Sequence, residues 1–309
     1  MAFGDVDKIW MDGDLKDWED AQIHVLSHVV HYGSGVFEGI RCYDTVRGPA
    51  VFRHRDHYER FHNSADALGI DLDYSVEELV DATHEVIEEN GLESCYIRPV
   101  AFYGYNSLGV DPSDCPVRTA IAAWPWGAYL GEDAIKNGVE VQVSSWRRYH
   151  SSQMPTTAKI NGGYVNSLLS KTEALERGYE ESIMLNKEGD VAEGSGENLF
   201  MVDDGTIYTP GLGSSVLDGI TRRSVSQIAN DLGYEVVEKS ISRGELYNAD
   251  ELFFTGTAAE VTPIRKVDDV VIGEGTRGPI TEEIQSTFFD VVEGERPEYD
   301  AWLDFVGDE

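Results

Sequence analysis

The chain has 309 residues and a formal net charge of −33, from 24 basic and 57 acidic side chains. A surface this acidic repels polyphosphate, which disfavours nucleic-acid binding. No apolar run approaches membrane-spanning length, and the N-terminus lacks the basic and hydrophobic regions of a signal peptide, so we expect a cytoplasmic protein without a membrane segment.

The first half of the chain is expected to contain two helices. Apolar residues at helical spacing predict a helix over residues 54–68 that ends at Gly69. A second helix is expected between Ser75 and Asn90, because Ser75 and Glu78 have the spacing of a capping box. Asn90 is followed by glycine, which is typical of a helix end.

Two strands and a domain boundary are expected next. Residues 94–104 and 118–126 are rich in β-branched and aromatic side chains and predict strands. Proline and glycine interrupt the middle of the chain, so we place an interdomain linker at residues 124–136. This division predicts a smaller N-terminal α/β domain over residues 1–123 and a larger C-terminal α/β domain over residues 137–309.

The second half is expected to alternate strands and helices. Residues 217–233 predict a helix that Asp218 caps and Gly233 ends. The other patterns predict a strand over 139–146, a helix over 164–179, short strands over 181–210 and a strand running into a glycine turn over 249–264.

Several familiar chemical motifs are absent from the sequence. It has no glycine-rich nucleotide loop, no HExxH motif and no paired CxxC motif, so nucleotide-binding and zinc-protease interpretations lose their usual support. The cysteines Cys42, Cys95 and Cys115 lack metal-ligand spacing and are odd in number. We therefore expect them to be reduced and structural, and we expect no metal site.

The acidic residues are spread along the whole chain rather than gathered in a tail, and arginine (16) outnumbers lysine (8). This composition is typical of proteins from salt-accumulating cytoplasms, where charge repulsion is screened over about 3 Å near 1 M salt. We therefore expect a halophilic protein.

Lys159 is the only charged residue in the window from Ser151 to Ser170. A lysine becomes nucleophilic when desolvation or a nearby cation holds its amine neutral, and a nearby carboxylate would do the opposite. Gly162 and Gly163 permit close backbone approach beside it. The alternative interpretation is an ordinary solvated loop lysine.

Two glycine turns could bind a phosphate. Gly219 precedes Ile220 and Thr221 at an expected helix start, and Gly256 precedes Thr257 after an expected strand. Each pattern is also common in proteins without ligands. Together with a reactive lysine and a carboxylate for a ring nitrogen, however, they supply what pyridoxal phosphate requires. These residues alone do not choose between Glu193 and Glu197 as that carboxylate.

The sequence resembles a known enzyme family at several motifs. Lys159, EGSGENLF at 193–200, Thr209 and LDGITR at 217–222 resemble the signature of class IV, or fold-type IV, aminotransferases. HYGSGVFEGIRCY, YIRP, PWGAYLG and TGTAAE further resemble the branched-chain amino acid aminotransferases, and the likeness runs from Ile9 to Trp302. It implies an α+β protein of fold-type IV, whose two α/β domains hold pyridoxal 5'-phosphate at their interface.

The resemblance also implies roles for residues around the cofactor. Lys159 would form the aldimine and then carry a proton between the substrate Cα and the cofactor. Glu193 would pair with the pyridine nitrogen, and Tyr164 with the ring oxygen. Arg60 would meet the phosphate, and the remaining cofactor contacts implied are Gly196, Leu217, Gly219, Ile220, Thr221, Gly256 and Thr257.

The implied substrate site takes both apolar and acidic side chains. The α-carboxylate would be held by Tyr96, Thr257 and Ala258. Arg98 and Tyr32 would receive the distal carboxylate of glutamate. A neighbouring subunit would lend Tyr32 and Val110, which requires a homodimer at least and allows a trimer of dimers. The aliphatic side chain would be enclosed by Phe37, Trp126, Tyr129, Tyr164 and Ala259.

The implied activity is amino transfer between L-leucine, L-isoleucine or L-valine and 2-oxoglutarate by a ping-pong cycle. A D-amino acid aminotransferase, an aminodeoxychorismate lyase and a non-enzymatic binding protein of the same fold are the alternatives. One departure from the family pattern is Asp218, which stands where some relatives have proline. It could cap the following helix or repel a phosphate there.

Overall fold

The structure, a computed structural model, describes residues 6–127 and 130–307. The described residues form two compact units. Unit 1 holds the chain up to Trp126, Ala158–Gly163 and the C-terminal stretch from Val291, and unit 2 holds Gly127–Thr157 and Tyr164–Asp290. Within the described ranges, no helix combines the length and apolar character needed to span a membrane.

The expected domain division is corrected in one respect. The first crossing between units, after Trp126, falls inside the expected linker 124–136, of which residues 128–129 lie outside the described residues. The stretch 137–309 does not, however, form one C-terminal domain. Ile160 forms an antiparallel bridge with Val36, and the last strand pairs with an N-terminal one, so two later segments join unit 1. Long-range backbone pairing of this kind leaves no local sequence signal.

Unit 1 is built on a sheet of eight described strands in the order β17-β5-β4-β6-β7-β1-β2, with β3 paired to β6. These neighbours are antiparallel throughout. The strands are β1 (Lys8–Met11), β2 (Asp14–Asp17), β3 (Gly35–Phe37), β4 (Ile40–Thr45), β5 (Gly48–Phe52), β6 (Cys95–Tyr103), β7 (Val117–Trp124) and β17 (Leu303–Phe305).

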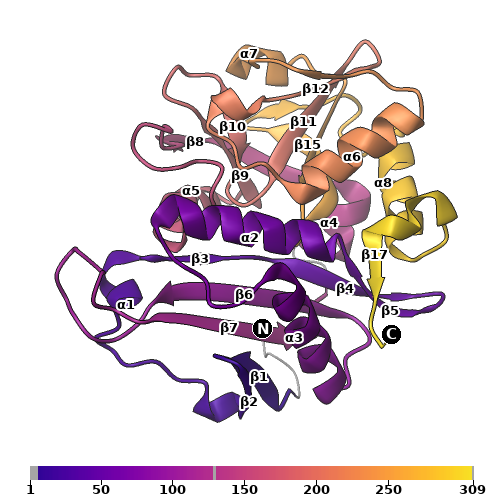
Figure 1. Ribbon diagram of the computed structural model, residues 1–309. Helices are drawn as coiled ribbons and strands as arrows, with labels where there is room; N and C mark the ends of the chain where they lie inside the picture. The colour runs from indigo at the N-terminus through magenta and orange to yellow at the C-terminus, as the bar shows by residue number, and fades with distance from the viewer. Residues whose placement is uncertain (1–5, 128–129, 308–309) are drawn as a thin grey trace. The chain divides into compact units, whose positions relative to one another are not determined.

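The helices of unit 1 include both predicted ones. Figure 1 shows α2 (His54–Leu68) running along the sheet, where it contacts β3 and α3 (Val76–Glu89). Gly69 ends α2 in the left-handed conformation at φ 71°, as predicted. The capping box of Ser75 and Glu78 at the start of α3 is also confirmed. The shorter elements are α1 (His28–Tyr32) and 3-10 turns at Trp18–Asp20, Asn161–Gly163 and Pro297–Trp302.

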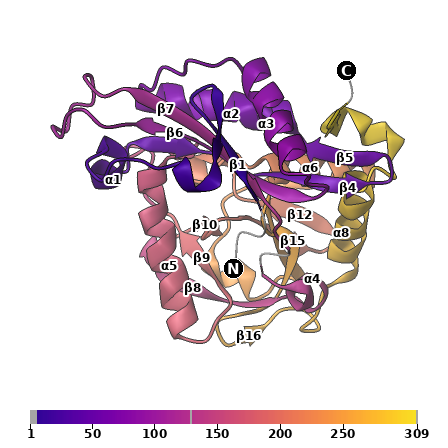
Figure 2. The same ribbon diagram turned by 90° about the horizontal axis from the view of Figure 1, so that it is seen from below.

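Unit 2 is built on a mixed sheet of nine described strands in the order β10-β9-β8-β15-β14-β11-β12-β13, with β16 paired to β15. Figure 2 shows α5 (Tyr164–Glu176) lying along β8 and β9, which it contacts. The strands are β8 (Val139–Arg147), β9 (Glu181–Leu185), β10 (Val191–Gly194), β11 (Asn198–Asp203), β12 (Thr206–Thr209), β13 (Val236–Glu238), β14 (Glu251–Gly256), β15 (Glu260–Val267) and β16 (Val270–Val271). The remaining helices are α4 (Glu132–Asn137), α6 (Ile220–Asp231), α7 (Arg243–Leu246), α8 (Pro279–Val292) and a 3-10 turn at Leu212–Ser214.

The start of α6 differs from the prediction. Its N-cap is Gly219, in extended conformation and without a side-chain cap, and Asp218 instead approaches Arg223 to 3.5 Å. Asp218 stands one position too early to cap the helix. The expected strand over 249–264 is an antiparallel pair, β14 and β15, in which Gly256 lies opposite Glu260. The turn between these strands contains Thr257.

Candidate functional site

The backbone of Lys159 is fixed inside unit 1. Its N–H donates to Ser64 Oγ on α2 at 3.0 Å, and its carbonyl accepts from the N–H of Phe37 at 3.1 Å. The next residue, Ile160, bridges Val36 in β3. Lys159 is therefore positioned from both sides by regular elements, as a reactive side chain requires.

Two glycines allow a close backbone approach next to Lys159. The N–H of Gly162 donates to the carbonyl of Gly33 at 3.1 Å. A Cβ on Gly33 would lie 2.7 Å from Gly162 Cα, and Gly33 has φ 61°. Side chains are thus excluded where these two segments touch, which confirms the close backbone approach predicted for Gly162.

The pKa of the Lys159 amine lies well below the ordinary value for lysine. Burial and then the charge of Arg60 lower it to about 8, while Glu38 acts in the opposite direction. The Nζ atom lies 4.9 Å from the centroid of the Phe37 ring. This environment contradicts a solvated loop lysine and suits a nucleophile and proton carrier near neutral pH.

Arg60 belongs to a buried ion network. Its Nε and Nη2 bind the two oxygens of Glu38 at 2.7 and 2.8 Å, and His57 Nδ1 lies 2.8 Å from the same carboxylate. Glu38 is fully buried. Burial alone would raise the pKa of Glu38, but Arg60 and His57 hold it well below its usual range. The carboxylate therefore stays charged and orients the guanidinium beside Lys159.

Tyr96 and Arg98 are neighbours on β6. The Tyr96 hydroxyl accepts from Arg98 Nη2 at 3.0 Å, and a Cβ on Gly39 would lie 2.0 Å from that hydroxyl. The Arg98 guanidinium lies 4.9 Å from the centroid of the Phe37 ring, and its Nε is buried without a hydrogen-bond partner among the described residues. A guanidinium with a buried, unsatisfied N–H suits a carboxylate ligand.

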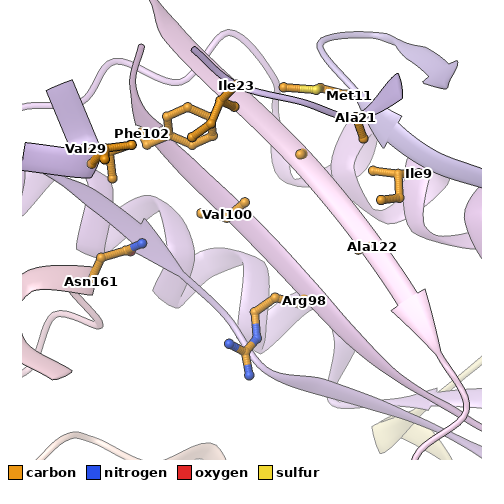
Figure 3. Close-up of a pocket in the computed structure, with 12 residues that line it drawn as sticks. Ile9, Met11, Ala21, Ile23, Val29, Arg98, Val100, Phe102, Ala122 and Asn161 are labelled. Atoms are coloured by element: carbon orange, nitrogen blue, oxygen red, sulfur yellow. The ribbon is translucent and has the colours of Figure 1, made fainter. Parts of the chain in front are cut away.

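Arg98 also borders a cavity of about 450 Å³ in unit 1. Figure 3 shows its guanidinium beside an otherwise largely apolar lining that includes Val29, Val100 and Phe102. Two predicted site residues lie on the exposed surface of this unit: Tyr32 is 45% exposed and Val110 is 79% exposed.

Glu193 is the centre of a second set of residues, in unit 2. One of its oxygens binds Arg148 Nε at 2.8 Å, and the other accepts from the N–H of Leu217 at 2.9 Å and from Asn198 Nδ2 at 3.2 Å. Glu193 and Arg148 are each 5% exposed. Although burial opposes the charged form, the Glu193 carboxylate raises the pKa of Arg148. Glu193 is thus oriented by three donors on three segments.

Glu197 differs from Glu193 in its surroundings. It is buried, and its carboxylate accepts from the N–H of Gly196 at 3.0 Å. Burial, followed by the charge of Glu181, raises the pKa of Glu197 to about 8. Glu193 has an arginine partner, whereas Glu197 is mostly protonated at neutral pH. The geometry therefore favours Glu193 as the anionic carboxylate, a choice that the residue pattern left open.

The start of α6 offers donors to an anion. Among the described residues, the amides of Ile220 and Thr221 have no hydrogen-bond acceptor, because Gly219 provides no side-chain cap. A Cβ on Gly219 would lie 1.9 Å from Asn198 Oδ1, so glycine is required there. The amides, the Thr221 hydroxyl and the positive end of the helix form a cradle that suits a phosphate.

Comparison with known proteins identifies the family. Residues 35–267 match the family described as amino-transferase class IV. The chain belongs to the class IV aminotransferases. A branched-chain-amino-acid aminotransferase of Pseudomonas aeruginosa is 49% identical over 307 residues, which are 99% of this chain and 100% of that protein. The present chain accordingly has the fold-type IV aminotransferase fold.

Two solved structures agree with this assignment. The Escherichia coli branched-chain amino acid aminotransferase has a TM-score of 0.96 and 48% identity, and the match covers 98% of this chain and 100% of that one. The branched-chain amino acid aminotransferase from Thermoproteus uzoniensis, an archaeon, was solved with norvaline and has a TM-score of 0.93 and 48% identity, with 97% and 99% covered. A third structure in this group is a branched-chain enzyme complexed with N-(5'-phosphopyridoxyl)-L-glutamate, with a TM-score of 0.94 and 49% identity.

The class IV cofactor, pyridoxal 5'-phosphate, fits the groups present. Unit 1 provides a lysine amine of lowered pKa, and unit 2 provides an oriented carboxylate and an unsatisfied helix N-terminus. These are the kinds of amine, acid and phosphate partner that this cofactor needs. In the second glycine turn that could bind a phosphate, between β14 and β15, Thr257 is half-buried.

The predicted site residues divide between the units. Trp126 lies next to Tyr96 in unit 1, with 4.4 Å between the two ring centroids. Tyr129 lies outside the described residues. Unit 1 holds Tyr32, Phe37, Arg60, Tyr96, Arg98, Val110, Trp126 and Lys159, and unit 2 holds Tyr164, Glu193, Gly196, Leu217, Gly219, Ile220, Thr221, Gly256, Thr257, Ala258 and Ala259.

Sequence reasoning missed four residues that position these groups: Glu38 and His57 around Arg60, and Arg148 and Asn198 around Glu193. The motifs FEGIR and EGSGEN contain Glu38 and Asn198, so their position inside family motifs was an available signal. Nothing in the local sequence distinguishes Arg148 from Arg147, which precedes it.

Proposed function

We propose that this chain is a pyridoxal-phosphate-dependent branched-chain amino acid aminotransferase that exchanges the amino group of L-leucine, L-isoleucine or L-valine with 2-oxoglutarate. The observation that carries the proposal is Lys159, whose amine has a pKa of about 8 within a chain that matches branched-chain enzymes over almost its full length. A pKa near the working pH is what a group that both attacks and carries protons needs.

The cofactor, when bound, supplies an electron sink that stabilises negative charge at the substrate Cα. Lys159 would take the proton from that carbon and return it in the other half of the cycle. Glu193, held by Arg148, would keep a proton on the pyridine nitrogen. Arg60 and the amides at the start of α6 would hold the phosphate, and Tyr164, near the charge of Arg148, would donate to the ring oxygen.

Substrate carboxylates would be held by two sets of donors. Tyr96, with the turn at Thr257 and Ala258, would bind the α-carboxylate, and Arg98 the distal carboxylate of glutamate. Support for the latter is the buried, unsatisfied Nε of Arg98. The Phe37 ring beside Arg98 would contact an aliphatic side chain instead, which lets one pocket accept both substrate classes.

A second copy of the chain would complete the pocket by supplying Tyr32 and Val110. Both side chains are exposed in this chain, and the Tyr32 hydroxyl donates to the carbonyl of Leu108 at 2.8 Å. The same two stretches of chain, 23–32 and 105–110, also expose the large hydrophobic side chains of Ile23, Val25, Leu26, Val30, Tyr105 and Leu108. Analytical ultracentrifugation should therefore detect a dimer or a trimer of dimers and no stable monomer.

Salt dependence follows from the net charge of −33. We propose that the protein works in a salt-accumulating cytoplasm, where counterions screen repulsion among its carboxylates. Dialysis into dilute buffer should lower its Tm and its activity, and full retention of both would contradict this proposal.

The decisive experiment is an absorption spectrum of the purified protein in high salt, before and after addition of L-leucine. The cofactor band should change with L-leucine and return with 2-oxoglutarate. A band that ignores L-leucine but responds to D-alanine or to aminodeoxychorismate would replace the proposal with one of the alternative activities. A Lys159→Ala protein that still turned over would refute the role of Lys159.

A further inference from the structure

Three side chains from distant segments of unit 1 meet at the start of α2. His54 is the first residue of α2, His84 lies in α3, and Asp304 lies in β17. The Nδ1 atom of His54 is 2.6 Å from Asp304 Oδ2, and Nε2 of His84 is 3.1 Å from the same oxygen. Each residue offers one possible ligand atom, a ring nitrogen or a carboxylate oxygen, and these three atoms all lie within 4.8 Å of one another.

Hydrogen bonding does not fully account for this cluster. Both histidines direct a nitrogen at one carboxylate oxygen, yet Nε2 of His84 is buried and makes no hydrogen bond of good geometry among the described residues. Nε2 of His54 is also buried and unpartnered among the described residues, but it is Nδ1 of that ring that faces Asp304. Buried polar atoms are nearly always satisfied, so Nε2 of His84 is the atom of this cluster that lacks a well-placed partner.

We propose that His54, His84 and Asp304 bind a divalent transition-metal ion, with Zn²⁺ as the occupant. Two imidazole nitrogens and one carboxylate oxygen are ligands that Zn²⁺ prefers, whereas Mg²⁺ and Ca²⁺ prefer oxygen alone. The Asp304 side chain is 39% exposed, which leaves room for water as a fourth ligand.

The distances permit such a site after a small expansion. Ligands about 2.0 Å from a tetrahedral Zn²⁺ are about 3.3 Å from one another. The two nitrogen–oxygen distances to Asp304 are 2.6 and 3.1 Å, so each must open by less than about 1 Å. The histidine nitrogens lie within 4.8 Å of each other, so they must close by at most about 1.5 Å. Asp304 can take up part of this adjustment, because its strand is only three residues long.

Such an ion would tie together parts of unit 1 that meet only through folding. His54 and Asp304 are 250 positions apart, and β17 pairs with β5 over three residues. The helix that begins at His54 also carries His57 and Arg60, so a metal there would fix the helix that orients Arg60. The sequence motifs could not indicate this site, because each ligand comes from a different element.

The test measures metal binding by the holoenzyme in high salt, after dialysis against EDTA and then against chelator-free buffer containing excess Mg²⁺. The Mg²⁺ occupies weak carboxylate sites on this acidic surface. Equilibrium dialysis with Zn²⁺ should give one tightly bound ion per chain for the wild type and for the control His24→Gln, which replaces an exposed histidine. His84→Gln and Asp304→Asn should weaken binding by more than about 100-fold.

Two further measurements use the same samples. Co²⁺ in place of Zn²⁺ should give the visible absorption of a four-coordinate site in the wild type, and Zn²⁺ should raise the Tm of the wild type but not that of His84→Gln. The proposal is overturned if the wild type retains no stoichiometric Zn²⁺, or if His84→Gln retains it equally. Should a variant fail to fold, the wild-type Co²⁺ spectrum alone decides between a metal site and a hydrogen-bonded cluster.

Discussion

Replacing Lys159 by methionine should stabilise the protein when it is free of cofactor. Burial and the charge of Arg60 lower the pKa of Lys159 from 10.5 to about 8, so the fold disfavours its charged form. Methionine has a similar length and carries no charge, and it would remove this penalty. A reactive group that opposes folding is expected at a catalytic site.

The size of the gain follows from the pKa. The difference of 2.5 units between 10.5 and 8 corresponds to about 3.4 kcal/mol. Because Lys159 is only half-buried, solvent screening reduces this to roughly 1–3 kcal/mol. Between pH 8 and 10.5 the unfolded chain binds more protons than the folded one, so wild-type stability rises with pH and the advantage of Lys159→Met disappears.

Urea denaturation of the two apoproteins at constant high salt, from pH 7 to pH 10.5, measures this difference. Lys187→Met is the matched control, because Lys187 is exposed and forms only a 3.4 Å pair with its neighbour. The control should show no comparable gain at pH 7. Equal stability of the wild type and Lys159→Met at pH 7, or a difference that does not change with pH, would refute the reasoning.

Three further predictions concern unit 2. Gly219→Ala should lower cofactor affinity more than tenfold in a titration, because its Cβ would lie 1.9 Å from a neighbouring amide oxygen, whereas Gly213→Ala meets nothing within 4 Å and should bind normally. Arg148→Gln should destabilise the fold by about 3–5 kcal/mol in urea unfolding, because it leaves the buried charge of Glu193 without its cationic partner; a loss below about 1 kcal/mol would contradict this. Burial and a neighbouring carboxylate raise the pKa of Glu197 from 4.5 to about 8, so wild-type stability falls as pH rises through this range. Glu197→Gln should therefore exceed the wild type by on the order of 2–4 kcal/mol at pH 8.5 and lose that advantage below pH 5, and a pH-independent difference would argue against it.

The elements predicted correctly are those with local causes. Gly69 and the Ser75 capping box fixed the ends of two helices because caps act within a few residues. The start of α6 was wrong by one residue: a residue pattern cannot distinguish a capping Asp218 from an uncapped Gly219. That missing cap leaves the helix amides available, so the prediction failed at the feature that we propose holds the phosphate.

What could not be predicted depends on contacts between distant segments. Nothing near Leu303 indicates that β17 completes the sheet of unit 1 by pairing with β5. Likewise, the partners of Glu193 are Arg148 just after β8, Asn198 in β11 and Leu217 before α6, and no local pattern links them. The choice between Glu193 and Glu197 therefore needed either family resemblance or three-dimensional geometry.

The charge-free window around Lys159 has a different explanation from the one its sequence suggested. The absence of local carboxylates does not isolate the amine, because Glu38 acts on it from another part of unit 1. That charge is paired with Arg60 and His57, so its effect is smaller than the lowering from burial and from Arg60. The residues beside Lys159 are themselves enclosed: Ala158 is 4% and Ile160 is 3% exposed. A charged side chain there would be buried without a partner, so packing is sufficient to exclude charge from these positions, and the low pKa arises from groups that folding brings to the lysine.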